Sequence, residues 1–71
     1  MFYYDQKTLV IGNFKKIQSI SDSLMEFLFA NFRLQVEGTG LSLPYLEDAE
    51  VGVRGNITAI KMIYTKGEKN A

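Results

Sequence analysis

Hydrophobic residues along this chain come in short runs, and turn-forming residues interrupt them roughly every eight or nine positions. Strands at this spacing are typical of an all-β sandwich or barrel, and the spacing leaves no room for a strand–helix–strand unit. The pattern predicts one all-β domain over residues 1–65, a compact antiparallel β-sandwich or meander of six to seven short strands, followed by a polar C-terminal tail at 66–71. The predicted turns are Gly12-Asn13, Ser21-Asp22, Ala30-Asn31, Gly38-Thr39-Gly40, Glu47-Asp48 and Gly55-Asn56.

The clearest predicted strand follows Asn31, where Phe32, Leu34 and Val36 alternate with polar residues. Further strands are expected at 7–11, 14–20, 24–29, 41–43, around 51–53 and at 57–65. Pro44 has no backbone N–H for a sheet ladder, so the strand that contains Leu43 should lie at an edge or end there.

The segment 24–29 has a second reading, because Ser23-Leu24-Met25-Glu26 fits a helix capping box. A helix over 24–31 would have only about two turns, which is short. The aromatic residues Phe27 and Phe29 and the clear strand after Asn31 favour a strand and a hairpin, and the short helix remains the alternative.

Segments 24–29 and 57–64 carry apolar residues on both faces, whereas an antiparallel strand with one solvated face should be polar on one side. Exposed apolar surface often marks a contact, and a chain of 71 residues without stabilising cross-links often associates with itself. We therefore predict a homo-oligomer with contacts through Phe27, Phe29, Met62 and Tyr64. The residues Asn31, Gly38, Gly40 and Gly55 are predicted to shape turns, since glycine and asparagine tolerate left-handed backbone.

Composition limits the chemistry that the chain can perform. It has no His and no Cys, so the common nucleophile–base pairs and metal sites cannot be built, and we predict no enzyme activity, no cofactor and no metal. The acidic group at Glu47, Asp48 and Glu50 could offer oxygen ligands to Ca²⁺, but a solvated turn is the simpler interpretation. Glu26, the charge inside an apolar segment, could mark a site, but pairing with a neighbouring base or exposure to solvent is favoured.

Charge and hydropathy bear on partners and location. Eight basic and eight acidic residues give a net charge of zero, and the basic residues are scattered, which argues against nucleic-acid binding. The apolar runs are too short to span a bilayer, and the N-terminus lacks the features of a signal peptide. We expect a cytoplasmic protein without direct membrane insertion.

Apolar-x-apolar-x-Gly steps recur along the chain, with short strands and an acidic turn between them. The segments in this outline are Ile20-Ser21-Asp22, Leu24 to Phe29, Leu34-Gln35-Val36-Glu37-Gly38, Gly40-Leu41-Ser42-Leu43, Leu46-Glu47-Asp48-Ala49-Glu50, Val51-Gly52-Val53-Arg54-Gly55 and Asn56-Ile57-Thr58-Ala59-Ile60. This outline resembles the small sporulation proteins of the YabP/YqfC type over about four-fifths of the chain. The turn glycine that is usual between the central strands of the family is Asn31 here.

The resemblance implies a non-enzymatic role in endospore formation, in the mother cell or the developing spore envelope. It implies partners among other sporulation proteins: the spore coat for members of the YabP type and a membrane-bound partner for those of the YqfC type. It supplies no catalytic residues. An Sm-like or OB-like barrel that binds single-stranded nucleic acid has a similar length and strand density and remains the alternative function.

Overall fold

The computed structural model describes residues 2–5 and 7–64, and within them six antiparallel strands form one open sheet without any helix. The all-β antiparallel class is therefore confirmed, and the segment at 24–28 is a strand rather than a short helix. The tail predicted at 66–71 lies outside the described residues. The strands are β1 (Phe2–Asp5), β2 (Thr8–Gly12), β3 (Lys16–Ile20), β4 (Leu24–Leu28), β5 (Phe32–Glu47) and β6 (Glu50–Tyr64).

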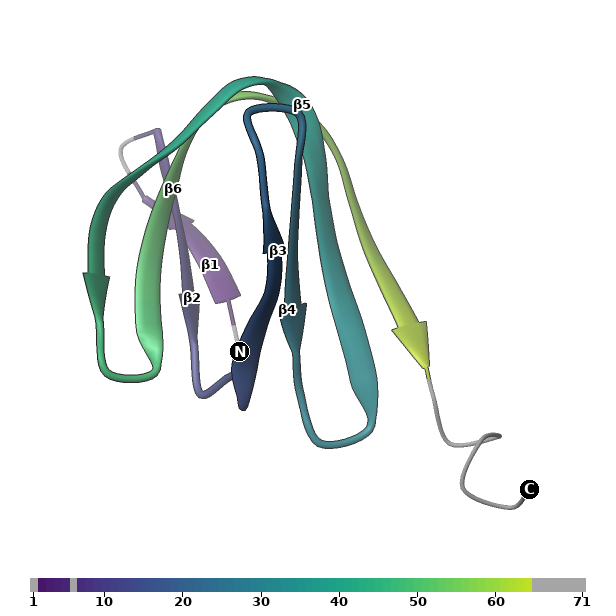
Figure 1. Cartoon of the computed structure of the whole chain (residues 1–71). Coiled ribbons are helices and arrows are strands. Elements are labelled where there is room, and N and C mark those ends of the chain that lie inside the picture. Colours follow the sequence, from purple (N-terminus) through teal and green to yellow (C-terminus); the bar gives the residue numbers. More distant parts are fainter. Residues whose placement is uncertain (1, 6, 65–71) are drawn as a thin grey trace.

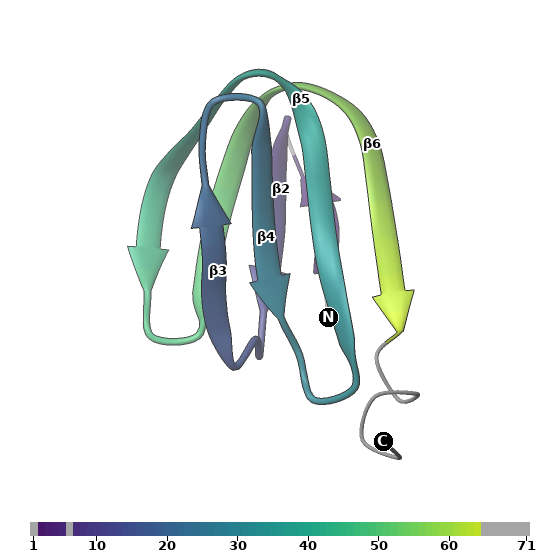
Figure 2. The ribbon, with the colours of Figure 1, turned by 45° about the vertical axis from the view of Figure 1, so that its right-hand side comes forward.

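The sheet folds over on itself because its two longest strands are bent. The strand order is β1-β2-β6-β5-β4-β3, so the hairpin of β5 and β6 lies at the centre. Both strands arch over the top of the molecule and descend on either side (Figures 1 and 2). The first half of β5 pairs with β4, whereas the first half of β6 pairs with β2. The two arms of one sheet thus face each other, as the two sheets of a sandwich would.

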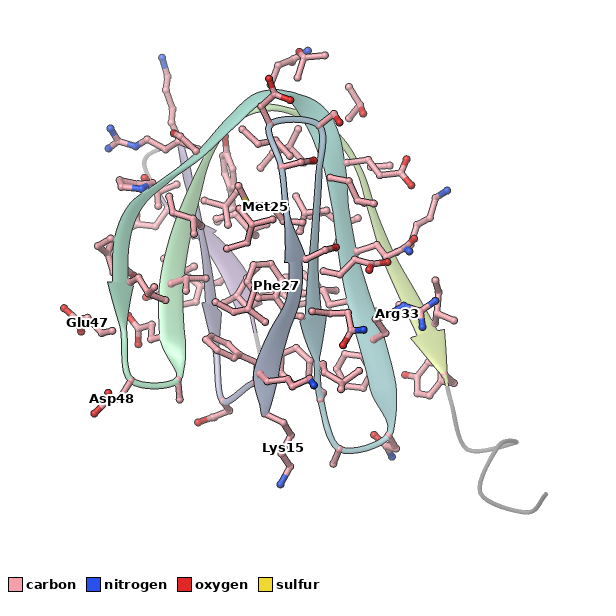
Figure 3. The ribbon with its side chains drawn as sticks, in the orientation of Figure 1. Lys15, Met25, Phe27, Arg33, Glu47 and Asp48 are labelled. Atoms are coloured by element: carbon pink, nitrogen blue, oxygen red, sulfur yellow. The ribbon has the colours of Figure 1, made fainter. Side chains whose placement is uncertain are left out.

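The core fills the space between these arms and comes from side chains on the inner face of every strand except β1 and β3. Figure 3 shows Met25 and Phe27 of β4 pointing into this space. No polar or charged residue is buried among the described residues, so the core is held by apolar packing. The cluster consists of Leu9, Ile11, Met25, Phe27, Phe29, Leu34, Val36, Leu41, Val51 and Val53.

Four of the six predicted turns connect consecutive strands, and the loop at Ala30-Asn31 is one of them. The backbone N–H of Phe29 donates to the carbonyl of Phe32 at 2.8 Å and closes this two-residue hairpin. The expectation that Asn31 uses left-handed backbone is wrong, because the described non-glycine residues with positive φ are Lys7, Asn13 and Ala49.

The other two predicted turns are wrong, because Gly38-Thr39-Gly40 lies inside β5 and Gly55-Asn56 lies inside β6. These glycines bend continuous strands instead of reversing the chain, and the β5–β6 register shifts on both sides of Thr39. Gly40 has φ of 63° and Gly55 has φ of 136°, values that residues with a Cβ rarely adopt. The segments expected at 41–43, around 51–53 and at 57–65 therefore belong to only two strands.

Pro44 marks an edge but does not end its strand. Among the described residues, β5 beyond Gly38 pairs with no strand other than β6, although the N–H of Leu41 still donates to the carbonyl of Asp22 in the β3–β4 turn. Pro44 lies beyond that contact, on a side where the structure describes no neighbouring strand and the missing N–H of proline is tolerated. The register also shifts between Ser42 and Tyr45, which is consistent with a bulge at this position. β3 begins at Lys16 and so omits the first residues of the segment predicted at 14–20.

Candidate protein interaction surface

The charge inside β4 is satisfied by its neighbours. The carboxylate of Glu26 lies 3.5 Å from the Nε of Arg33, and it accepts hydrogen bonds from the side chains of Ser19 and Gln35. These residues occupy the outer face of the sheet, because Met25 and Phe27 on either side of Glu26 point inward. The arrangement agrees with pairing to a neighbouring base, the interpretation that the sequence favoured over a reactive site.

The acidic turn lies at the tip of the β5–β6 hairpin. Figure 3 shows Glu47 and Asp48 directed away from the molecule, and the three acidic residues of the turn are exposed. The carboxylate of Glu50 accepts a hydrogen bond of 2.9 Å from the hydroxyl of Tyr45. Among the described residues, no three His, Cys, Asp or Glu side chains are arranged so that they could hold a metal ion together. The exposure of the three acidic residues is what a solvated turn would show.

Among the described residues, Tyr45 is the ionisable group whose pKa clearly departs from its ordinary value. Its ring lies over Gly52, where a Cβ would come within 2.6 Å of the ring atom Cε2. Desolvation, followed by the hydrogen bond to Glu50 and the negative charge of that carboxylate, raises the pKa of Tyr45 to about 12. A phenol that holds its proton so firmly serves as a hydrogen-bond donor to the turn and is poorly suited to general base chemistry.

Two of the predicted contact residues belong to the core, and their prediction as surface residues is wrong. Phe27 is fully buried and Phe29 is 9% exposed. Phe27 packs against the ring of Phe14, and Phe29 stacks on the ring of Phe32. The apolar character of both faces of β4 misled the prediction, because the inner face is covered by the opposite arm of the same chain.

The other two predicted contact residues, Met62 and Tyr64, are exposed and lie on one stripe with Ile60. Residues directly opposite each other in a sheet share a face, and Met62 lies opposite buried Leu34. The stripe therefore belongs to the inner face of the sheet. Its members keep 39% (Ile60), 42% (Met62) and 62% (Tyr64) of their surface exposed, and we call these three residues the β6 stripe.

The strand that carries the β6 stripe is also an edge strand over its second half. β2 pairs with β6 only from Glu50 to Val53, so residues 57–64 have β5 on one side and no strand on the other within the described residues. In Figures 1 and 2 this half of β6 runs down one side of the molecule, apart from β1 and β2. Its backbone groups and its apolar inner face are thus available together, which is the property of an interaction edge.

A groove continues from the β6 stripe towards the N-terminal strand. It has a volume of about 390 Å³ and separates β1 from the second half of β6. Its walls include Phe2, Tyr4, Leu9, Ile57 and Ile60. Ile60 and Tyr4 were not among the contact residues predicted from the sequence, although Ile60, Met62 and Tyr64 occupy every second position of the last strand. Tyr4 lines the groove because of the position of β1 in the sheet, which the local pattern of residues does not specify.

The other large apolar residues that are exposed are Tyr3 and Tyr4 of β1, which line the groove, and two residues outside it. Ile20 lies at the end of β3, and Leu46 lies on the edge half of β5 close to the acidic turn. Neither adjoins the β6 stripe along a strand. The second half of β6 is therefore the best candidate for a contact surface.

Comparison of the chain with models of known families, with curated proteins and with solved structures finds no match. Among the described residues there is no helix of the length and apolarity needed to cross a membrane.

Proposed function

We propose that this chain is a non-enzymatic protein–protein interaction module that acts in endospore formation. The observation that carries the first part is the exposed β6 stripe on an unpaired sheet edge. An edge strand offers backbone hydrogen bonds to a partner, and a row of apolar side chains adds burial to them. The sporulation setting rests on the resemblance to the YabP/YqfC type of protein.

The chemistry of the chain is consistent with a role in binding rather than catalysis. The sequence contains neither His nor Cys, and the titratable clusters around Glu26 and Tyr45 are engaged in hydrogen bonds within the domain. Exposed apolar surface, such as that at the sheet edge of β6, typically marks a site of protein–protein contact. The proposed partners are a second copy of the chain and other sporulation proteins of the coat or of a membrane-bound complex, met in the cytoplasm of the mother cell or in the forming spore envelope.

Deletion of the gene in its source organism, followed by a count of heat-resistant spores, tests this function. We expect fewer resistant spores with unchanged vegetative growth, and restoration by the wild-type gene. A Leu46→Lys gene should also restore the count, because Leu46 lies away from the β6 stripe. A normal yield of resistant spores after deletion would contradict the sporulation role.

A further inference from the structure

We infer that two copies of this chain pair through the second halves of their β6 strands, antiparallel and centred on Met62. The pairing deepens the proposed function, since it names a partner and its geometry, but its test in purified protein does not depend on sporulation. A failed spore experiment would leave the pairing open to measurement, and a monomeric protein would leave the spore experiment unaffected.

The edge has the properties that allow strand addition. Residues 59–64 of β6 pair regularly with β5 on one side, so the strand is already extended and ordered before a partner arrives. Natural edge strands usually avoid such pairing through charges, prolines, bulges or short length. Here the regular stretch carries one charged residue, Lys61, and no proline, and its bulge-like register shift lies before it, beside Gly38.

The single charge points away from the apolar stripe and has its own partner. The Nζ of Lys61 lies 3.2 Å from a carboxylate oxygen of Glu37, the neighbouring outer-face residue of β5. The ion pair leaves the edge electrically neutral. Two identical edges can therefore approach each other without net repulsion.

The register follows from the symmetry of an antiparallel pair. In a two-fold contact within one continuous sheet, a residue on the dyad faces its own copy and its neighbours face each other reciprocally. A dyad at Met62 sets Ile60 opposite the Tyr64 of the second copy and Lys61 opposite its Ile63. All members of both β6 stripes then form one apolar row, in which an aromatic residue faces a β-branched one on each side of the dyad. A dyad at Lys61 would instead place two lysines directly opposite each other, which is unfavourable.

A second copy fits this edge better than an unrelated strand because the edge is complementary to itself. In such a pair, apolar residues of one edge face apolar residues of the other and no charge is left unpaired. An identical edge therefore supplies every side chain that the contact needs. The added strand would extend the arm that ends at β6 past the mouth of the groove between β1 and β6, whose wall includes Ile60. The contact would thus shield apolar side chains that the monomer leaves in water.

Charge substitution at the dyad tests the pairing. Size-exclusion chromatography with light scattering, run over a range of protein concentrations, should give the wild type twice the chain mass of 8.1 kDa. Met62→Lys and Met62→Glu should each be monomeric, because each sets like charges opposite each other. An equimolar mixture of the two variants should regain the doubled mass, since Lys then faces Glu. Leu46→Lys, a matched change at another exposed apolar residue, should keep the dimer.

Cysteine cross-linking tests the register, and the natural chain contains no cysteine to interfere. Met62→Cys should form a disulfide-linked dimer under mild oxidation, because residues opposite on a dyad have Cβ atoms about 4.5–5.5 Å apart. Ser19→Cys, on the edge strand β3, should remain largely monomeric under the same conditions. A wild type that is monomeric at all concentrations, a mixture of charge variants that stays monomeric, or linkage through Ser19→Cys in place of Met62→Cys would each overturn the proposal. Circular dichroism confirms that the variants fold, as expected for a site with 42% of its surface exposed.

Discussion

The bend in the central hairpin depends on the absence of a side chain at Gly38, and Gly38→Ala tests that dependence. A Cβ at this position would lie 3.0 Å from the Cα of Ile57 and closer still to the carbonyl oxygen of Asn56. Both atoms are backbone atoms of β6, which pairs with β5 along its length. They cannot move aside as the end of a flexible side chain could.

The cost of the added methyl group should be close to that of overpacking a core, about 1–3 kcal/mol, because relief requires the two strands to separate. For a domain of this size, each 1 kcal/mol lowers the melting temperature by about 4–8 °C. We therefore expect Gly38→Ala to melt at least about 4 °C below the wild type. The methyl group at Gly38 should also weaken the β5–β6 hydrogen bonds around the bend, since they span the same strands.

Two other glycines provide matched controls. A Cβ at Gly12 would lie 3.7 Å from the carbonyl oxygen of Ala49, an ordinary contact, so Gly12→Ala should be nearly neutral. Gly40 has φ of 63° with nothing within 4 Å of its Cβ position, so Gly40→Ala isolates backbone strain, worth about 1–2 kcal/mol. Thermal melts of the three variants by circular dichroism, at one protein concentration because an oligomer melts in a concentration-dependent way, give the comparison.

The order of stability expected from these geometries is Gly12→Ala above Gly40→Ala, with Gly38→Ala at or below Gly40→Ala. If Gly38→Ala has the same melting temperature as Gly12→Ala, then β5 and β6 do not approach each other at the bend as described. The residues at 38–40 and 55–56 would then form the two separate turns that their sequence suggests, and β5 and β6 would not be continuous bent strands.

Further predictions concern the core, the tyrosine and an exposed ion pair. Phe27→Ala should lower the free energy of unfolding by about 3–5 kcal/mol, measured by urea denaturation, because it leaves a cavity between the two arms; a loss below about 1 kcal/mol would contradict its burial. The pKa of Tyr45 is raised to about 12, so the ultraviolet titration of the wild type minus that of Tyr45→Phe should have its midpoint near pH 12. The pKa of Tyr45 should be lower in Glu50→Gln, because that change removes the negative charge of the carboxylate. The unfolded phenol loses its proton near pH 10, so the stabilisation due to Tyr45 is full below that pH and is lost as pH rises towards 12; a transition near 10 would refute the hydrogen bond to Glu50. Glu37→Gln should cost less than about 1 kcal/mol in the same urea assay, because the ion pair of its carboxylate with a lysine is exposed, and a larger loss would show a more buried pair.

Much of the fold follows from local pattern. The alternation of Phe32, Leu34 and Val36 predicts a strand with these residues on one face, and Leu34 and Val36 are fully buried. The turn at Ala30-Asn31 and the strand before it follow from the same reasoning, because a two-residue loop between apolar runs favours a hairpin. These features depend on residues close together in the sequence, and so the sequence alone determines them.

The long-range features could not be predicted in this way. A glycine can either reverse the chain in a turn or bend a continuous strand. Only the pairing of residues 38–47 with 50–57 shows that the glycines here bend strands. The positions of Phe27 and Met62 show the same limit. Both are apolar residues on two-sided apolar strands, yet Phe27 is enclosed by the opposite arm and Met62 is exposed where that arm ends.

The sequence by itself determined that this protein is all-β, where most of its strands begin, and that its chemistry is poor in catalytic groups. The tertiary structure decided which glycines bend the sheet, which aromatic residues form the core and which apolar stripe reaches the surface. The physical reason is that local pattern specifies the face on which a side chain lies, whereas burial depends on whether another part of the chain covers that face. In a single sheet folded upon itself, the covering residues are distant in sequence.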